Sequence, residues 1–242
     1  MSNQVKKTLD NFVVGKSNQF AYHMVDSISN SISDFLIFYG ETGTGKTHLL
    51  QAIKNMPNMQ DKNIIYVKSE SFLNDFIDNI RNHTMSEFQK KYRHCNFLLI
   101  DDIQYLSNKE GTQEELYHTI EVLRSSGKKI VFTSNKHPKH LSGFSSYLKS
   151  QLLSALSIKI KSPKKKVIIA IIKQKASEMD ICLNEKTIDF IVKNSKKNIY
   201  QIESMIMKLK AHSTLFNQDI TFKIAKKVLR NEIIKDKDKK QT

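Results

Sequence analysis

The amino-acid sequence predicts an α/β fold: a mostly parallel β-sheet covered by helices on both faces, followed by a small helical domain. Two observations support this prediction. Short apolar runs alternate with amphipathic stretches along the first two thirds of the chain, whereas no strand-like run follows Pro163. Alternating strands and helices are typical of a parallel sheet, because each parallel connection has to cross one face of the sheet.

Strands are predicted where short, mainly apolar runs are bounded by polar residues: 35–39, 63–67, 97–100, 129–133 and 157–160. Continuous apolar runs suit strands that are buried on both faces. The fifth run, Ser157-Ile158-Lys159-Ile160, alternates between polar and apolar residues and suits an edge of the sheet. Amphipathic helices are predicted between the runs, at about 18–30, 46–56, 69–82, 84–93 and 112–125.

The chain after Pro163 has the pattern of four amphipathic helices, at 164–180, 184–195, 198–215 and 220–234. Asn184 and Thr221 stand near the start of two of them, where their side chains suit helix N-caps. We therefore expect an α/β domain over residues 1–162, a helical domain over 163–234 and a charged tail over 235–242.

The composition is that of a globular protein without membrane or secretion signals. Of the 242 residues, 39% are hydrophobic, and no run of about 18 apolar residues is present to span a membrane. The N-terminus lacks the apolar stretch of a signal peptide, and Cys95 and Cys182 show neither metal-ligand spacing nor a disulfide framework. We expect a soluble, cytoplasmic protein with no membrane span.

The net charge of +15 has two interpretations. It is concentrated in residues 161–242, which contain 20 basic and 9 acidic residues. A basic surface attracts nucleic-acid phosphates. Only four of the 39 basic residues are arginine, however, and this excess of lysine also fits compositional bias with a solvated lysine surface. Charge alone leaves both interpretations open.

A glycine-rich string directly follows the first predicted strand and opens a predicted helix. It reads Gly40-Glu41-Thr42-Gly43-Thr44-Gly45-Lys46-Thr47, which is the spacing of a phosphate-binding loop. The glycines let consecutive backbone N–H groups wrap a phosphate, and the positive end of the helix dipole points at the same anion. We expect Lys46 to reach the β- and γ-phosphates of ATP and Thr47 to bind Mg²⁺.

Polar side chains follow two other predicted strands. Asp101 and Asp102 end the third apolar run, and Asn135 follows the fourth. Beside a phosphate loop, Asp101 is expected to hold the Mg²⁺ shell, and Asp102 to orient or deprotonate a water that attacks the γ-phosphate. Asn135 is expected to contact that phosphate or that water. Without the phosphate loop, such residues would fit ordinary solvated loops and turns.

Four strings together resemble the AAA+ domain of bacterial replication initiators of the DnaA family. They are Asn11-Phe12-Val13-Val14-Gly15-Lys16-Ser17-Asn18, Gly45-Lys46-Thr47-His48-Leu49-Leu50, Leu98-Leu99-Ile100-Asp101-Asp102-Ile103-Gln104 and Thr112-Gln113-Glu114-Glu115. The resemblance extends from about Thr8 to Ile233. It implies a five-stranded sheet of order 5-1-4-3-2 with a helical lid, and an extra helix pair at 69–93 that faces single-stranded DNA and steers assembly.

The resemblance also implies which residues bind the nucleotide. It places Val13 and Val14 beside the adenine and the loop around the phosphates. The complete set of expected nucleotide-binding residues is Val13, Val14, Gly43, Thr44, Gly45, Lys46, Thr47 and His48.

The chain departs from the family where arginines are expected. The family's arginine-finger string matches Tyr147-Leu148-Lys149-Ser150-Gln151, and its lid arginine matches Tyr200. Arginine fingers contribute about 10³–10⁵ in rate, and neither lysine nor tyrosine copies their planar fork. Asn135 also replaces a usual aspartate. The sequence thus predicts ATP binding with slow hydrolysis at most.

The chain shows no helix-turn-helix after the lid, so we expect either a piece of an initiator or a lid-terminated relative such as the Hda-type regulators. The leading hypothesis is an ATP-binding protein of replication initiation or its control. Its expected partners are ATP or ADP, further copies or an initiator, and single-stranded DNA. The alternatives are an AAA+ helicase loader, which the Asp101-Asp102-Ile103-Gln104 string disfavours, and a nucleotide-stabilised interaction module without turnover.

Overall fold

The structure is a computed structural model that describes residues 6–28 and 33–232. The chain forms two compact units. Among the described residues, the sheet unit contains Lys6–Phe12 and Asn18–Lys161, and the lid unit contains Val13–Ser17 and the chain from Ser162 onward. The tail expected at 235–242 lies outside the described residues. Each unit has a hydrophobic interior of its own.

The sheet unit is built on five parallel strands: β1 (Phe35–Tyr39), β2 (Ile64–Lys68), β3 (Phe97–Asp101), β4 (Lys129–Ser134) and β5 (Leu156–Lys159). Their order, β2-β3-β4-β1-β5, is the expected order 5-1-4-3-2 read from the other edge. This confirms the predicted fold class. β5 is an edge strand, as its alternating sequence predicts, and only Ile158 within it is fully buried.

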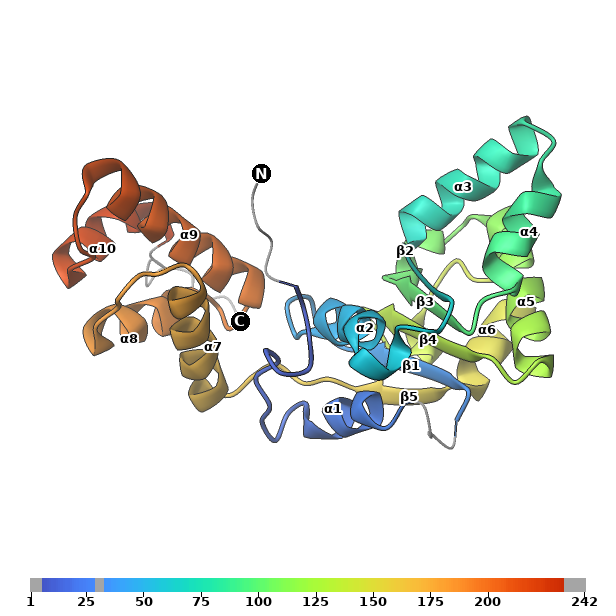
Figure 1. The fold of residues 1–242 in the computed structure, drawn as a ribbon, viewed down its shortest axis with the longest axis horizontal. Helices are drawn as coiled ribbons and strands as arrows, with labels where there is room; N and C mark the ends of the chain where they lie inside the picture. The colour runs from blue at the N-terminus through green and yellow to red at the C-terminus, as the bar shows by residue number, and fades with distance from the viewer. Residues whose placement is uncertain (1–5, 29–32, 233–242) are drawn as a thin grey trace. The chain divides into compact units, whose positions relative to one another are not determined.

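Two hydrophobic cores lie on opposite faces of this sheet, because side chains alternate along each strand. Ile37 and Phe132 belong to one core, whereas their neighbours Leu36 and Val131 belong to the other. The second core is closed by α1 (Gln19–Asp26) and α2 (Lys46–Asn55). The first is closed by α3 (Ser69–Arg81), α4 (Met85–Arg93), α5 (Glu110–Ser125) and α6 (Ser146–Ser154) (Figure 1).

Most helices lie where the sequence predicts them. The helix predicted at 220–234, however, is shorter, because α10 (Phe222–Val228) ends at Val228 and is followed by a 3₁₀ turn. Two further differences concern the sheet unit. Helix α6 was not expected, because only Leu148 and Leu152 are buried in it and one such pair is too short to show a helical period. Helix α5 begins at Glu110 and includes Gly111, two residues before the predicted start. Short 3₁₀ turns complete the unit at η2 (Pro57–Met59), η3 (Ile103–Leu106) and η4 (Pro138–His140).

The lid unit consists of α7 (Lys165–Glu178), α8 (Glu185–Asn194), α9 (Ile199–Phe216) and α10 (Phe222–Val228), with η5 (Arg230–Glu232). The predicted caps form: Asn184 Oδ1 accepts from Thr187 N at 2.9 Å, and Thr221 Oγ1 accepts from Ile224 N at 3.3 Å. The segment Val13–Ser17 packs on α7, since a Cβ at Gly15 would lie 2.4 Å from Val167 Cγ2.

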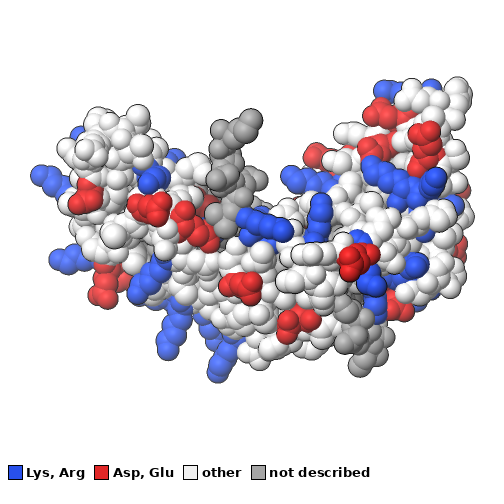
Figure 2. Space-filling model, viewed as in Figure 1, with Lys and Arg blue, Asp and Glu red and all other residues white. Residues whose placement is uncertain are grey.

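Figure 2 shows lysine and arginine side chains interspersed with acidic ones on the face that it draws. Within residues 6–28 and 33–232, no helix is long and apolar enough to cross a bilayer.

Candidate nucleotide-binding site

The phosphate loop occupies the turn between β1 and α2. Gly40 donates its N–H to the Ser134 carbonyl at the end of β4, at 3.2 Å, so the loop starts beside a neighbouring strand end. A Cβ at Gly40 would lie 2.2 Å from the carbonyl oxygen of Ile160, which leaves room for glycine alone. Gly45 precedes α2 with φ 98°, a left-handed conformation that glycine adopts without strain.

Lys46 is almost fully buried within this loop, at 6% exposure. Its Nζ donates to the carbonyl oxygens of Gly40, at 2.8 Å, and Glu41, at 2.9 Å. Burial lowers the pKa of Lys46 below its ordinary value, while the negative charges of Asp102 and Asp101 act in the opposite direction. The structure therefore brings the loop lysine and the two strand-end aspartates together, as the sequence predicts.

Asp101 ends β3 with a side chain held on both carboxylate oxygens. It is 2% exposed; Thr133 Oγ1 donates to Oδ1, and the Tyr66 hydroxyl donates to Oδ2 at 3.3 Å. Tyr66 in turn accepts from Gln51 Nε2 at 3.0 Å, and burial is the main cause that raises its pKa to about 12. The tyrosine thus stays a neutral hydrogen-bond donor across the physiological range, and the Asp101 carboxylate is fixed in one orientation.

Asp102 adopts a left-handed backbone conformation, φ 60° and ψ 55°, that non-glycine residues adopt at a cost. Its N–H donates to Thr133 Oγ1 at 2.7 Å. Its Oδ1 accepts from Gln104 Nε2 at 2.9 Å, while Gln104 Oε1 accepts from the N–H of Asn135 at 3.1 Å. Asp102 and Asn135, the two predicted catalytic residues, are thereby joined through one side chain.

No site role was predicted for three residues that contact Asp101 or Asp102: Tyr66, Gln104 and Thr133. Tyr66 and Thr133 lie on strands that the sequence shows only as apolar runs, so their hydroxyls give no local signal. Gln104 lies in the string that marks the family resemblance, but its contacts depend on a residue 31 positions away. The register of β2, β3 and β4, rather than sequence spacing, brings these groups together.

The remaining predicted residues differ in how the structure places them. Gly43 and Thr44 are buried in the loop, where the Thr44 hydroxyl donates to the Glu41 carbonyl at 2.9 Å. Thr47 is half-buried in the first turn of α2. The ring of His48 contacts the Thr8 carbonyl at 2.8 Å and packs edge-on against Phe12, so its side chain anchors the N-terminal segment.

Val13 and Val14 belong to the segment of the lid unit and are half-buried and exposed, respectively. Their placement beside the adenine stays a prediction.

The Mg²⁺ expected at this site needs oxygen ligands in a rigid arrangement. Asp101 supplies an oriented carboxylate and Thr47 a hydroxyl at the loop. These hard oxygen donors fit the ion, and its binding stays a prediction.

The positions where the resemblance predicts arginines have other roles here. Tyr147, on α6, packs edge-on against the ring of Tyr117. Between the two finger positions, Lys149 donates to the Leu141 carbonyl at 3.0 Å. Gln151, on the same helix, accepts from Arg124 Nη1 at 2.7 Å. Tyr200 lies in the first turn of α9 with 51% of its surface exposed.

The comparison with known proteins places this site in a family. A model of the bacterial DnaA ATPase domain matches residues 3–159. The chain belongs to the DnaA family. Among curated relatives, it is 44% identical over 229 residues to the chromosomal replication initiator protein DnaA of Sulfurimonas denitrificans, and 44% identical over 227 residues to that of Helicobacter hepaticus. These matches cover 93% of the chain but 53% and 50% of the two relatives.

Solved DnaA structures have the same fold. Domain III of Thermotoga maritima DnaA superposes with a TM-score of 0.90 at 34% identity, covering 96% of this chain and 99% of that one. AMPPCP-bound DnaA from Aquifex aeolicus matches with a TM-score of 0.78 at 35% identity, over 87% of this chain and 67% of that one. A DnaA bound to AMPPCP and single-stranded DNA matches with a TM-score of 0.77 at 32% identity, over 90% and 70%. The chain spans about half the length of the curated DnaA proteins that it matches.

Proposed function

We propose that this chain binds Mg-ATP at the phosphate loop and acts in the initiation of chromosomal replication or in its regulation. The observation that carries this proposal is that Lys46, Asp101 and Asp102 lie at the same edge of the sheet. Lys46 binds the Gly40 carbonyl beside the end of β4, and both aspartates are hydrogen-bonded to Thr133 of β4. Lysine for phosphate and aspartate for the metal are the two charges that an ATP site requires. Related DnaA structures hold AMPPCP, an ATP analogue, and this supports the same ligand class.

Each residue has a distinct role in the proposed site. The backbone of Gly43–His48 surrounds the phosphates, Lys46 neutralises their charge, and Val13 and Val14 border the adenine. Thr47 and Asp101 hold Mg²⁺, which supplies a positive charge on the phosphate oxygens. Asp102 accepts a proton from the attacking water, and Asn135 contacts that water or the γ-phosphate.

Hydrolysis is proposed to be slow. Tyr147 and Gln151 stand at the two positions of the expected finger arginines, and Tyr200 at the position of the lid arginine. An arginine stabilises the charge that develops on the transferring phosphoryl group, which a neutral side chain cannot do. Nucleotide binding is proposed not to depend on these three arginines. We therefore expect the protein to act with ATP bound rather than through its hydrolysis.

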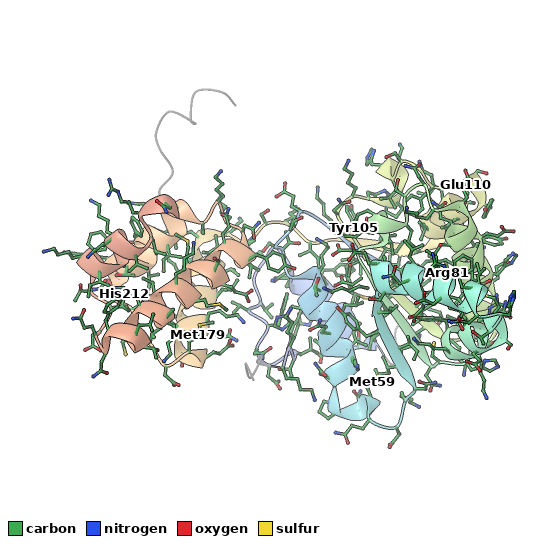
Figure 3. All side chains as sticks on the ribbon, turned by 90° about the horizontal axis from the view of Figure 1, so that it is seen from above. Met59, Arg81, Tyr105, Glu110, Met179 and His212 are labelled. Atoms are coloured by element: carbon green, nitrogen blue, oxygen red, sulfur yellow. The ribbon has the colours of Figure 1, made fainter. Side chains whose placement is uncertain are left out.

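Single-stranded DNA is the proposed nucleic-acid partner, at helices α3 and α4. One related DnaA structure contains single-stranded DNA. Of the basic residues on this pair, Lys91 is bound to Asp75 at 2.6 Å and Arg93 to Glu115 at 2.6 Å. Arg81, labelled on α3 in Figure 3, and Lys90 are exposed and are the residues proposed to meet the DNA backbone. Self-association and association with an initiator are proposed as the protein contacts.

Lys46→Ala tests the proposed function, with Lys54→Ala as the matched control. Lys54 is an exposed lysine in the last turn of the same helix. Titration calorimetry with Mg-ATP is expected to show that Lys46→Ala abolishes measurable binding and that Lys54→Ala binds like the wild type. Micromolar affinity retained by Lys46→Ala would refute the assignment of the site.

A further inference from the structure

Gln104 occupies a position between two elements of the candidate site. It lies in η3, directly after β3, and its side-chain amide is a donor at one end and an acceptor at the other. The donor is bonded to Asp102 Oδ1, at 2.9 Å, and the acceptor to the backbone N–H of Asn135, at 3.1 Å. One planar amide therefore spans the ends of β3 and β4.

This bridge is separate from the one that holds Asp101. The Thr133 hydroxyl donates to the carboxylate of Asp101 and accepts from the backbone N–H of Asp102. Thr133 thus fixes the backbone of Asp102 but leaves its side chain unrestrained. Within residues 6–28 and 33–232, the Gln104 amide is the one hydrogen-bond donor to the Asp102 carboxylate, so it sets the direction of that carboxylate.

The backbone of Asp102 makes such a restraint necessary. In the left-handed conformation the Cβ of Asp102 is directed away from the line of the strand, and strand pairing no longer determines where the side chain points. A single flexible carboxylate in this setting has several rotamers of similar energy. The following residue, Tyr105, labelled in Figure 3, is 57% exposed.

We propose that Gln104 is a positioning residue that holds the carboxylate of Asp102 and the backbone of Asn135 in one fixed register beside the γ-phosphate. This inference rests on the proposed ATP site and extends it to a residue that touches neither nucleotide nor water. Because Asn135 is expected to meet the γ-phosphate, ATP but not ADP contacts this bridged network, and the base is already oriented when ATP enters the loop.

The reaction that this arrangement serves is the hydrolysis of ATP. The water oxygen forms a bond to the γ-phosphorus, and the bond from that phosphorus to the bridging oxygen breaks, leaving its electron pair on ADP. The Asp102 carboxylate accepts the proton that the water loses. Because a general base has to lie within hydrogen-bonding reach of the water, its direction matters as much as its presence.

Two variants of Gln104 separate its two hydrogen bonds. Gln104→Met has a similar length but forms neither bond. Gln104→Glu keeps an acceptor for the Asn135 N–H, but its ionised carboxylate cannot donate to Asp102. Gln60→Met, at an exposed glutamine of the same unit, is the matched control.

The measurements are ATP and ADP affinities and single-turnover hydrolysis of radiolabelled ATP. Gln104→Met is expected to leave ADP affinity within about twofold of wild type while the ratio of ATP to ADP affinity falls by about fivefold to tenfold, the size of one hydrogen bond. Its hydrolysis rate is expected to fall by about tenfold or more. Gln104→Glu should keep the ratio of ATP to ADP affinity but lower the hydrolysis rate. The double variant Gln104→Glu/Asp102→Asn should hydrolyse ATP no more slowly than Asp102→Asn alone.

A merely structural role gives a different result: ATP and ADP affinities fall together, and the Gln104→Glu loss persists in the Asp102→Asn background. Either result, or an unchanged affinity ratio in Gln104→Met, overturns the proposal. If wild-type hydrolysis is below detection, the affinity ratio decides alone. Failure of the ATP site itself is recognised separately, because then Lys46→Ala would still bind ATP.

Discussion

Replacing Thr133 by valine removes one hydroxyl that serves both aspartates of the candidate site. Thr133 is fully buried on β4. Its hydroxyl donates to the Asp101 carboxylate and accepts from the N–H of Asp102, which is 31 residues away in the sequence. Valine has nearly the same shape, so the substitution deletes two hydrogen bonds while it creates almost no cavity.

The expected cost follows from the burial of the groups left behind. Asp101 is 2% exposed, so its carboxylate cannot replace the lost donor with bulk water. A hydrogen bond to a charged group contributes about 1.5–3 kcal/mol, and an unpaired backbone N–H adds about 1 kcal/mol. We therefore expect Thr133→Val to lower the free energy of unfolding by about 2.5–4 kcal/mol. For a unit of this size, that corresponds to a Tm lower by roughly 5–16 °C.

Thr133→Ser is the control, because it keeps the hydroxyl and removes only a methyl group, at a cost of about 1 kcal/mol. Unfolding of wild type and both variants is followed by circular dichroism in nucleotide-free buffer, with urea as well as heat. A Thr133→Val protein as stable as Thr133→Ser would refute the reasoning that the hydroxyl, rather than the packing of the methyl group, is what β4 contributes to this site.

Two further predictions concern the loop and the helix pair. Gly45→Ala forces a side chain into φ 98° with its Cβ 3.0 Å from the Phe12 ring, so nucleotide affinity is expected to fall about 5- to 100-fold, the equivalent of about 1–3 kcal/mol of strain. Gly127→Ala, at φ 62° with nothing within 4 Å of its Cβ, should retain wild-type affinity in the same titration, and an equal loss there would contradict a local effect. The pKa of Asp75 is lowered: burial acts to raise it, but hydrogen bonds from Lys91 and Tyr92 outweigh burial. The ionised form is thus favoured by folding, so the stability advantage of wild type over Asp75→Asn should be present above pH 3.8 and shrink as acid takes the pH below that value; an advantage independent of pH would disprove the ionic contribution.

The sequence was sufficient for the parts of the fold that depend on local pattern. The first four strands are mainly apolar runs, the fifth has the alternating pattern of an edge strand, and the phosphate loop lies in the strand–loop–helix context that its motif needs. Helix α6 escaped prediction because its buried face is a single pair of leucines. Within the site, the motif predicted Lys46 at the start of α2 and the two aspartates at the end of β3, and their roles in binding stay predictions.

The supporting contacts were not predictable in the same way. That the Tyr66 hydroxyl meets Asp101 depends on the pairing of β2 with β3, and that Gln104 meets Asn135 depends on a left-handed turn at an aspartate. The local sequence predicts neither contact. Strand pairing is not visible from the sequence around Tyr66, and an aspartate after a strand adopts many turn conformations. The residues expected to bind could be named from the sequence, whereas the side chains that hold them in place became visible only in the structure.

The two carbonyl contacts of Lys46 make ligand entry an exchange rather than an addition. An incoming phosphate has to displace the oxygens of Gly40 and Glu41 as acceptors for the ammonium group. A weakly polar ligand offers the lysine nothing better than the amide oxygens it already holds, whereas the charged oxygens of a polyphosphate do. The backbone of the loop therefore favours highly charged ligands. A ligand has to be a stronger acceptor than the Gly40 and Glu41 carbonyls before Lys46 leaves them.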